Sequence, residues 1–188
     1  MKKRMFFPVL FSAALICASF KPQQTQKPPV TAEIHWYTFQ EAFNLNKKKP
    51  KKIFIDVYTD WCGWCKKMDA TTYKDPVIIK LMNKYFYAVK LNAEMKDTVI
   101  MDSVRLVNPR PDVKGSTHQL ATSLLNNQMG YPTAVVLSEK LALMSQPIAG
   151  YLPSENLEPI LVFLGESYSL KESWEEFSKN YKSQNPSK

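Results

Sequence analysis

The spacing of apolar and polar residues changes several times along the chain, and each change predicts an element. The run Ile53–Tyr58 is apolar and rich in β-branched residues except at Asp56, which predicts a buried central strand with a buried carboxylate. Burial should raise the pKa of that carboxyl group. Phe86–Leu91 and Thr133–Leu137 show the same kind of run and predict two further strands.

Helices are predicted where capping signals precede apolar residues three or four positions apart. Thr38 and Glu41 form a capping box for a helix that runs to about Lys47. The helix after Cys62 should pause near residues 74–76, where Asp75 is a cap and Pro76 the first position of a new helical segment. The helix after them carries an apolar stripe, made of Val77, Ile78, Leu81, Met82 and Tyr85.

The C-terminal part of the chain predicts two more helices. One starts near Pro153-Ser154-Glu155 and carries apolar residues at helical spacing, namely Leu157, Ile160, Leu161 and Leu164. The other covers about Lys171–Tyr181, and we expect Trp174 and Phe177 to pack it against the rest of the domain.

The remaining segments predict shorter elements. Ile34–Tyr37 is a short strand, and Leu141–Ile148 is the antiparallel partner of the preceding strand, after a turn over 138–140. Ser103–Val107 is irregular or a short strand, and a loop follows over Asn108–Gly115. Thr117–Asn126 is a helix capped by Ser116 or Thr117, with His118 in its first turn in a structural or surface role.

The first residues have the pattern of a targeting segment. Three cations at positions 2–4 precede an apolar run, Met5–Ala18, that is too short to span a bilayer, and polar, proline-rich sequence follows. We therefore expect a signal peptide over 1–19, a flexible linker over 20–32, and an exported, periplasmic protein. A lipid anchor on Cys17 is the less favoured alternative, because Ile16 stands where a small residue is expected.

Composition adds two limits to this picture. With 188 residues and 45% hydrophobic composition, the chain can bury one substantial core, which we place in a single domain over 33–188. The formal charge of +8 falls to +5 without the three N-terminal cations. The lysine-rich run over 47–52 could bind nucleic acid, but a solvated loop is favoured, and export argues against that partner.

Two cysteines, Cys62 and Cys65, follow the central strand at the point where a helix begins. The N-terminal end of a helix stabilises a thiolate, and the thiolate is the species that attacks disulfides. Cys62 is therefore the predicted nucleophile and Cys65 the resolving thiol. By the same strand–turn–helix prediction, Cys62 should face the solvent side of the turn, and Cys65 should lie one turn further inside. The alternative is a metal site, but zinc needs four ligands and only His35 and His118 are left to complete one.

The six residues Trp61–Lys66, which read WCGWCK, resemble the active-site motif of thioredoxin-like proteins, with Trp64 where thioredoxin itself has proline. Further matches follow the family order. They are Asp56, Lys90, the turn Gly130-Tyr131-Pro132-Thr133 and Gly150. The resemblance covers about residues 34–165. It implies an α/β, thioredoxin-like fold, in which helices flank a central mixed sheet, with an insertion over about 95–129 and a C-terminal helical extension over about 166–183.

The resemblance also implies roles for the matching residues. Asp56 assists proton transfer to and from the resolving cysteine, with Lys90 beside it. Pro132 is expected in the cis form facing the sulfurs. The family's client groove and its rim would here consist of Trp61, Gly63, Trp64, Tyr131, Pro132 and Thr133.

The function implied is that of an exported thiol–disulfide oxidoreductase, acting through the dithiol with no metal and no other cofactor. Its expected partners are client proteins and a membrane electron-transfer protein, and it is expected to be a monomer that binds no nucleic acid. Two alternatives stay open at this point: a redox-inactive binding module on the same fold, and an oxidant or isomerase rather than a reductase.

Overall fold

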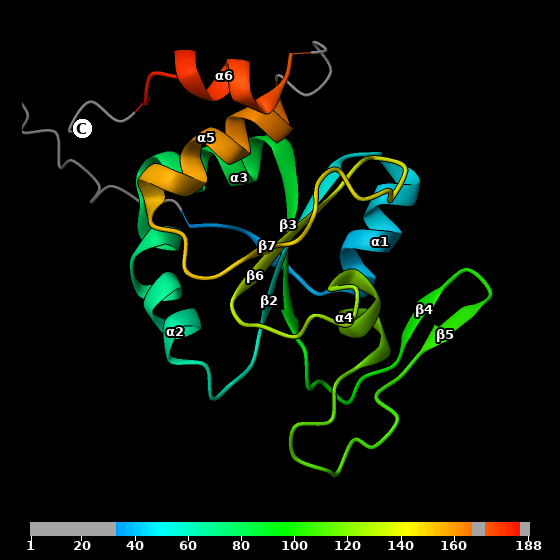
Figure 1. Ribbon diagram of the computed structural model, residues 1–188. Coiled ribbons are helices and arrows are strands. Elements are labelled where there is room, and N and C mark those ends of the chain that lie inside the picture. Colours follow the sequence, from blue (N-terminus) through cyan, green and yellow to red (C-terminus); the bar gives the residue numbers. More distant parts are fainter. Residues whose placement is uncertain (1–32, 167–171, 185–188) are drawn as a thin grey trace, which may run out of the picture. The chain divides into compact units, whose positions relative to one another are not determined.

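A five-stranded mixed sheet is the centre of the computed structural model, which describes residues 33–166 and 172–184 (Figure 1). In spatial order its strands are β1 (Trp36–Tyr37), β3 (Phe86–Asn92), β2 (Lys52–Tyr58), β6 (Thr133–Leu137) and β7 (Ile148–Ala149). The first three are parallel, β6 is antiparallel to β2, and β7 is antiparallel to β6. The predicted α/β fold with a mixed central sheet is confirmed.

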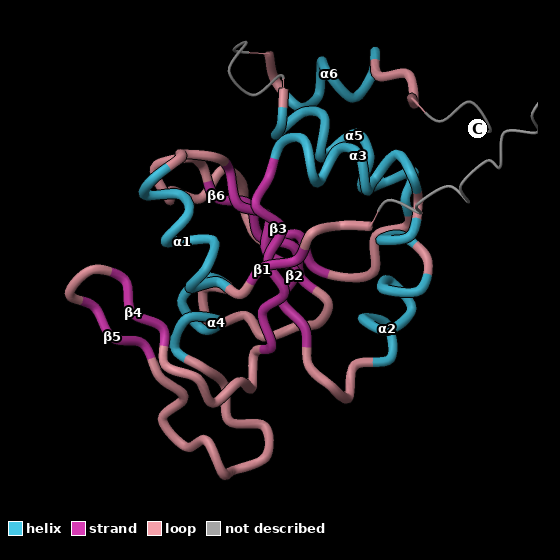
Figure 2. Tube along the Cα trace, turned by 180° about the vertical axis from the view of Figure 1, so that it is seen from behind, coloured by secondary structure: helices cyan, strands magenta, loops and turns pink. Residues whose placement is uncertain are grey.

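Helices cover both faces of this sheet, as the view from behind shows (Figure 2). α1 (Phe39–Lys48) and α4 (Gln119–Leu124) lie on one face. α2 (Gly63–Ala70), α3 (Pro76–Tyr85) and α5 (Ser154–Gly165) lie on the other. Two apolar clusters result, one on each side of the sheet, which explains why the central strand has an almost continuous apolar run.

Side chains of β2 alternate between the two clusters. Ile53, Ile55 and Val57 pack with α1 and α4, whereas Phe54 packs with α3 and α5. Asp56 is two positions from Phe54, so it shares that strand face. The sheet register therefore sets a carboxylate on the α2–α3 side of the sheet.

Local capping signals were accurate guides to the helix ends. The predicted capping box of Thr38 and Glu41 is present at α1. Asp75 accepts hydrogen bonds from the backbone N–H groups of Val77 (2.8 Å) and Ile78 (3.3 Å) at the start of α3. The predicted pause before this helix is a 3₁₀ turn, η1 (Thr72–Lys74).

The segment between β3 and β6 contains a hairpin that was only half predicted. Its second strand, β5 (Val104–Leu106), lies where an irregular segment or a short strand was expected, whereas β4 (Val99–Met101) was not expected. The side chain of Gln40 on α1 accepts from the backbone N–H of Ile100 (2.7 Å) and donates to its carbonyl (3.0 Å). Such a strand depends on a partner sixty residues away, which local spacing does not reveal.

The predicted cap of α4 was wrong, and the helix is shorter than Thr117–Asn126. His118 is its N-cap, and its Nδ1 accepts from the backbone N–H of Leu120 (3.1 Å). The other ring nitrogen therefore carries the proton and donates to the carbonyl of Asp97 (3.0 Å). Burial lowers the pKa of His118 and so favours the neutral ring. The two hydrogen bonds of this ring connect α4 to the loop before β4.

The strand expected over Leu141–Ile148 is antiparallel to β6, as predicted, but the predicted extent was wrong. Only Ile148–Ala149 forms β7, and Leu143 makes a single bridge to Leu137. Leu141 has a positive φ of 63°, which ends the extended conformation, and Pro147 cannot donate a backbone hydrogen bond. Turn geometry therefore overrides the apolar pattern here.

The C-terminal extension is the helix α6 (Trp174–Asn180), shorter than the predicted Lys171–Tyr181. The rings of Trp174 and Phe177 lie 5.4 and 5.2 Å from the ring of Phe163 on α5, as expected. The predicted signal peptide, linker and lipidation alternative, and residues 167–171 of the extension, lie outside the described residues.

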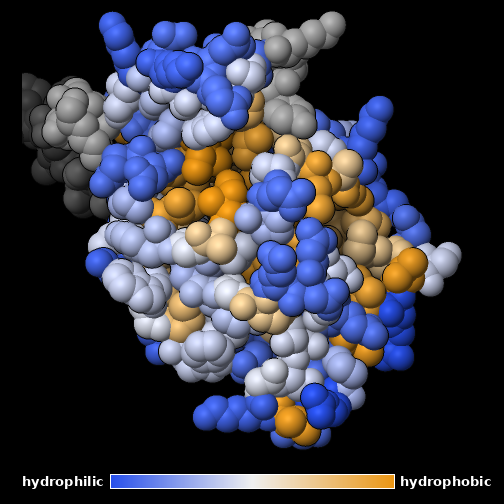
Figure 3. Space-filling view, in the orientation of Figure 1, coloured by the Kyte–Doolittle hydropathy of each residue, from blue (hydrophilic) through white to orange (hydrophobic). Residues whose placement is uncertain are grey.

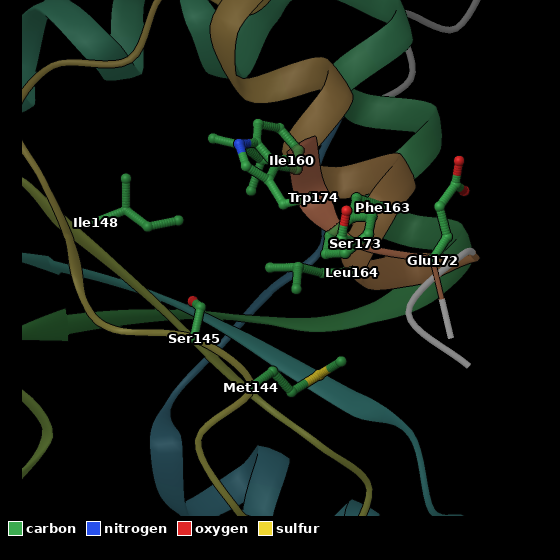
Figure 4. Close-up of a pocket in the computed structure, with 9 residues that line it drawn as sticks. All are labelled: Met144, Ser145, Ile148, Ile160, Phe163, Leu164, Glu172, Ser173 and Trp174. Atoms are coloured by element: carbon green, nitrogen blue, oxygen red, sulfur yellow. The ribbon is translucent and has the colours of Figure 1, made fainter. Parts of the chain in front are cut away.

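An apolar cavity of about 530 Å³ opens between α5, α6 and the loop before β7 (Figure 4). The space-filling view shows it as a hydrophobic hollow below α6 (Figure 3). The residues around it are Met144, Ser145, Ile148, Ile160, Phe163, Leu164, Glu172, Ser173 and Trp174. Among the described helices, none combines the length and the apolar character that a membrane crossing requires.

Candidate functional site

Cys62 and Cys65 form a disulfide at the start of α2, with their Cα atoms 5.3 Å apart. Cys62 is the N-cap of the helix, and its sulfur accepts the backbone N–H of Cys65 at 3.1 Å. The sulfur therefore lies in the field of the first unpaired N–H groups of the helix. This placement agrees with the position predicted from the sequence.

The predicted contrast in exposure between the two cysteines is nearly absent in the disulfide form. Cys62 is 5% exposed and Cys65 2%, so the expectation that Cys62 faces solvent was wrong for this state. The bond draws both sulfurs together under the surrounding side chains. What distinguishes Cys62 is its position at the helix terminus.

Asp56 lies in the middle of β2 and is 1% exposed. Its Oδ2 is 2.6 Å from the Nζ of Lys90, which is the residue opposite it in the register of β2 with β3. The burial predicted for this carboxylate is confirmed. So is its predicted proximity to Lys90, which follows directly from the parallel pairing of the two strands.

Lys90 has a second partner that the sequence did not indicate. Its Nζ is 2.5 Å from Oδ1 of Asp69 on α2, whose side chain is 45% exposed. Three aromatic rings surround the ammonium group at 4.8–5.3 Å from their centroids, namely Trp36, Tyr58 and Tyr73. The lysine thus joins a fully buried carboxylate to one near the surface, inside an aromatic enclosure.

One oxygen of Asp56 has no close hydrogen-bond partner among the described residues, and the buried hydroxyl of Tyr73 lies near enough to this carboxylate to oppose the rise of its pKa. Burial raises the pKa of Asp56, with the charge of Lys90 opposing that shift and the charge of Asp69 adding to it. Burial tends to lower the pKa of Lys90, but the two carboxylates raise it overall. A carboxyl group with a raised pKa takes up a proton at a higher pH than an exposed one does.

The turn before β6 contains the proline that the family resemblance singled out. The Tyr131–Pro132 peptide bond is cis. The carbonyl of Pro132 accepts the backbone N–H of Gly150 at 2.8 Å. Gly150 has a φ of 98°, a conformation that side-chain-bearing residues rarely adopt, which accounts for a glycine at this position.

Thr133 has a different surrounding from its neighbours in the turn. Its side chain is buried, and its hydroxyl donates to the carbonyl of Gly130 at 2.8 Å. This hydrogen bond stabilises the turn. Its predicted place in the client groove can therefore be filled only by its backbone.

Trp61 is 60% exposed and is fixed at two points. Its indole Nε1–H donates to Oε1 of Glu94 at 2.8 Å, and its ring meets that of Tyr131 edge-on at 5.8 Å. The carboxylate of Asp60 beside it accepts from Asn92 at 3.1 Å. Glu94 and Asp60 were not among the predicted site residues.

Trp64 is 57% exposed and lies against Tyr151, the residue after Gly150, at 5.6 Å between ring centroids. The ammonium group of Lys67 lies 4.7 Å from the Trp64 ring and 4.9 Å from the Tyr151 ring. Tyr151 and Lys67 were also missed. The spacing of Trp64 and Lys67 on a helix could have indicated their contact, but nothing local links them to a tyrosine 87 positions later.

The histidines considered for a metal site lie elsewhere. The ring of His35 packs against Tyr37 at 4.4 Å, and His118 is occupied as the cap of α4. Within the described part of the chain, no three residues of the types His, Cys, Asp or Glu lie close enough together to bind a metal. Gly63, the remaining predicted residue, is exposed between the two tryptophans.

The arrangement of strands, the disulfide at a helix terminus and the turn before β6 define a protein of the thioredoxin fold. A thioredoxin from Thermus thermophilus matches with a TM-score of 0.54 and 17% identity, over 73% of this chain and 93% of that one. A thioredoxin-fold protein from Helicobacter pylori matches with a TM-score of 0.51 and 15% identity, over 69% and 79% of the two chains.

The family model Thioredox_DsbH, described as a protein of unknown function, DUF255, matches residues 22–187, so the chain belongs to this family. Among curated proteins, human spermatogenesis-associated protein 20 is 27% identical over 146 residues, which are 76% of this chain and 16% of the human protein. An uncharacterized Caenorhabditis elegans protein is 29% identical over 133 residues, 69% of this chain and 16% of that protein. The chain thus matches only about a sixth of these relatives.

Membership of a thioredoxin-like family and a cysteine pair at this spacing support a thiol–disulfide oxidoreductase role. The chemistry that the pair can perform is an exchange of two electrons. A dithiol becomes the observed disulfide, and a disulfide elsewhere becomes two thiols.

Proposed function

We propose that this protein is an exported thiol–disulfide oxidoreductase that reduces disulfides in client proteins. The observation that carries the proposal is the Cys62–Cys65 disulfide at the N-terminus of α2, the helix whose Asp69 contacts the buried Asp56–Lys90 pair. The sequence has one other cysteine, Cys17, which lies in the predicted signal peptide. The pair in the domain is therefore free for redox work.

The reaction proceeds in two exchanges. The Cys62 thiolate attacks one sulfur of a client disulfide, a Cys62–client bond forms, and the other client sulfur leaves as a thiolate. Cys65 then loses its proton and attacks the Cys62 sulfur, which releases the second client thiolate and forms the Cys62–Cys65 disulfide. The client gains two electrons and the protein loses two.

Asp56 is proposed to receive the proton of Cys65 in the second exchange. Its raised pKa and its unpaired oxygen are the features that suit this role. Lys90 holds the carboxylate in place and compensates its charge when it is ionised. Pro132 and Tyr131 would provide the surface on which the client segment lies.

Export follows in this proposal from the pattern of residues 1–19. An exported reductase works in an oxidising compartment, so it needs a donor that delivers electrons across the inner membrane, and we propose a membrane-bound dithiol protein for that part. Fractionation of cells that produce the full chain checks the location. A product found in the cytoplasm at its uncleaved mass would contradict it.

The test of the reaction uses two single-cysteine variants. Cys65→Ser lacks the resolving thiol, so clients should remain attached to Cys62 and be recovered as covalent complexes. Cys62→Ser should capture almost none, because its remaining thiol lacks the helix-terminal field. Equal capture by both variants, or by neither, would overturn the proposal.

The direction of electron flow needs its own measurement. A reductase should equilibrate with glutathione near the potential of thioredoxin, about −270 mV, whereas a strong oxidant would lie near about −120 mV. Reduction of insulin by the dithiol-treated domain is the matching activity assay. A potential near the upper value would replace the reductase with the oxidant alternative.

A further inference from the structure

Two pairs of aromatic rings flank the disulfide, and the charged residues beside one pair differ in sign from those beside the other. The first pair is Trp61 with Tyr131, and the second is Trp64 with Tyr151. Tyr131 packs with the cluster on the α1–α4 side of the sheet, and Tyr151 with the cluster on the α3–α5 side. The two pairs therefore flank the disulfide from opposite faces of the sheet.

Carboxylates accompany the first pair. Glu94 accepts the indole N–H of Trp61, and Asp60 accepts the side-chain amide of Asn92. Both partners are neutral, and no ion pair of Glu94 or Asp60 is found among the described residues. This side of the disulfide is acidic.

An ammonium group, that of Lys67, lies against both rings of the second pair. Lys67 is exposed and lies within 5 Å of both ring centroids of that pair. No ion pair of Lys67 with a carboxylate is found in the part of the chain that the structure describes. Its charge is thus held in place by the rings and is open to an incoming anion.

We propose that this bipolar surface selects client segments by the order of charges around the client cysteine. The segment that fits best has an acidic residue on the side that reaches Lys67 and a basic residue on the side that reaches Glu94 and Asp60, with apolar residues against the rings. The proposal rests on the proposed function and assigns Lys67 and Tyr151 as residues that determine client specificity.

Neighbouring residues supply a matched control. Lys66 is the preceding residue of α2 and is equally exposed, and among the described residues no aromatic ring lies under its ammonium group. Lys66→Glu and Lys67→Glu change the net charge by the same amount on the same helix turn. Any difference between them reports the contact with the aromatic pair and not general electrostatic attraction.

The experiment uses two synthetic peptides with blocked ends, Glu-Leu-Cys-Leu-Lys and Lys-Leu-Cys-Leu-Glu, each as a symmetric disulfide dimer. They have the same composition and net charge and differ only in the order of charges. In the Cys65→Ser background, Cys62 attacks one dimer sulfur, one peptide becomes attached, and the other leaves as a thiolate. Mass spectrometry then gives the rate of adduct formation.

We expect one peptide to react about threefold to fivefold faster than the other at low ionic strength, the scale of an exposed ion pair. The preference should shrink in 0.5 M salt. Lys67→Glu should abolish or invert it, and Lys66→Glu should retain it. Tyr151→Ala should weaken it because Lys67 loses one ring, whereas Tyr151→Phe, which keeps the ring, should retain it.

Equal rates for the two peptides, or the same response to Lys66→Glu and Lys67→Glu, would overturn this selection and leave the proposed reaction intact. Absence of any adduct with either peptide would contradict the proposed function itself, and the selection with it. The two failures are therefore distinguishable in one set of measurements.

Discussion

Two carboxylates among the described residues are almost completely buried, and their hydrogen bonding differs. Glu158 on α5 is 2% exposed and Asp56 on β2 is 1% exposed. Glu158 accepts three hydrogen bonds, from the hydroxyls of Tyr181 (2.8 Å) and Ser183 (2.6 Å) and from the backbone N–H of Gln184 (2.5 Å). Asp56 has an ion pair on one oxygen and no partner for the other among the described residues.

Glu158 therefore has a structural role, whereas the surroundings of Asp56 are suited to proton exchange. Every donor around Glu158 stabilises its charged form, and together they tie the segment after α6 to α5. Asp56 is left with incomplete compensation, so burial raises its pKa and a proton can occupy its free oxygen. Incomplete hydrogen bonding at a buried site costs stability, and it is retained where proton exchange is needed.

The largest expected effect concerns the rate of the second exchange. Asp56→Asn removes the proposed proton acceptor, and resolution of the mixed disulfide at pH 7 should slow about a hundredfold, the scale of general base catalysis. Quenched-flow analysis of a preformed Cys62–client disulfide measures it. Glu158→Gln is the control and should leave this rate unchanged. If both variants resolve at the wild-type rate, the proposed role of Asp56 is wrong.

Removal of the other carboxylate should lower stability instead. Glu158→Ala leaves three donors without their acceptor, and we expect the free energy of unfolding to fall by about 2–3 kcal/mol. Urea denaturation monitored by tryptophan fluorescence gives the value. Glu139→Ala, at an exposed turn, should change it by less than about 0.5 kcal/mol. A loss for Glu158→Ala no larger than this control would show that the C-terminal contacts contribute nothing.

In the same urea assay, Asp56→Asn should raise the free energy of unfolding at pH 7 instead of lowering it. Because the folded state raises the pKa of Asp56, it binds the proton more tightly than the unfolded chain, and stability falls as pH rises through that interval. The variant should therefore be more stable than the wild type at pH 7, since Lys90 still has Asp69 as a partner. The gain should vanish below about pH 4, where Asp56 is protonated in both states. A loss at pH 7 would contradict this assignment.

The smallest effect is expected at Asp69. Its negative charge helps to raise the pKa of Asp56, so Asp69→Asn should lower that pKa and move the pH dependence of resolution toward lower pH. The resolution rate of the mixed disulfide between pH 5 and 9 measures the shift. Asp112→Asn removes an equal charge from an exposed pair with Lys96 and is the control. Identical profiles for the two variants would exclude Asp69 from the proton path.

The local sequence was sufficient for the core of the site. The apolar run of β2, the cap at Cys62 and the capping signals of Thr38 and Asp75 depend on residues within four positions of one another, so periodicity and helix-end chemistry reveal them. Asp56 stood out because a carboxylate interrupts a run that must be buried on both faces. The family resemblance added Lys90 and the turn at Pro132.

Other features depend on residues that are distant in the sequence. β4 is completed by the side chain of Gln40, α4 is capped by a buried histidine, and Leu141 turns where its apolar neighbours favour a strand. Each outcome follows from packing that outweighs a local preference of about 1 kcal/mol or less. Local sequence patterns do not contain such contacts, so the predictions were wrong at these positions.

By itself, the sequence determined the order of the main helices and of strands β1, β2, β3 and β6, the cysteine pair at a helix start and the buried aspartate, because each is set by neighbours along the chain. Only the tertiary structure decided which groups surround the disulfide. Asp69 reaches Lys90 through helix packing, and Tyr151 reaches Trp64 and Lys67 because the segment that follows β7 lies against α2. Charges and rings act over a few ångströms in space, and the fold alone brings these residues within that range.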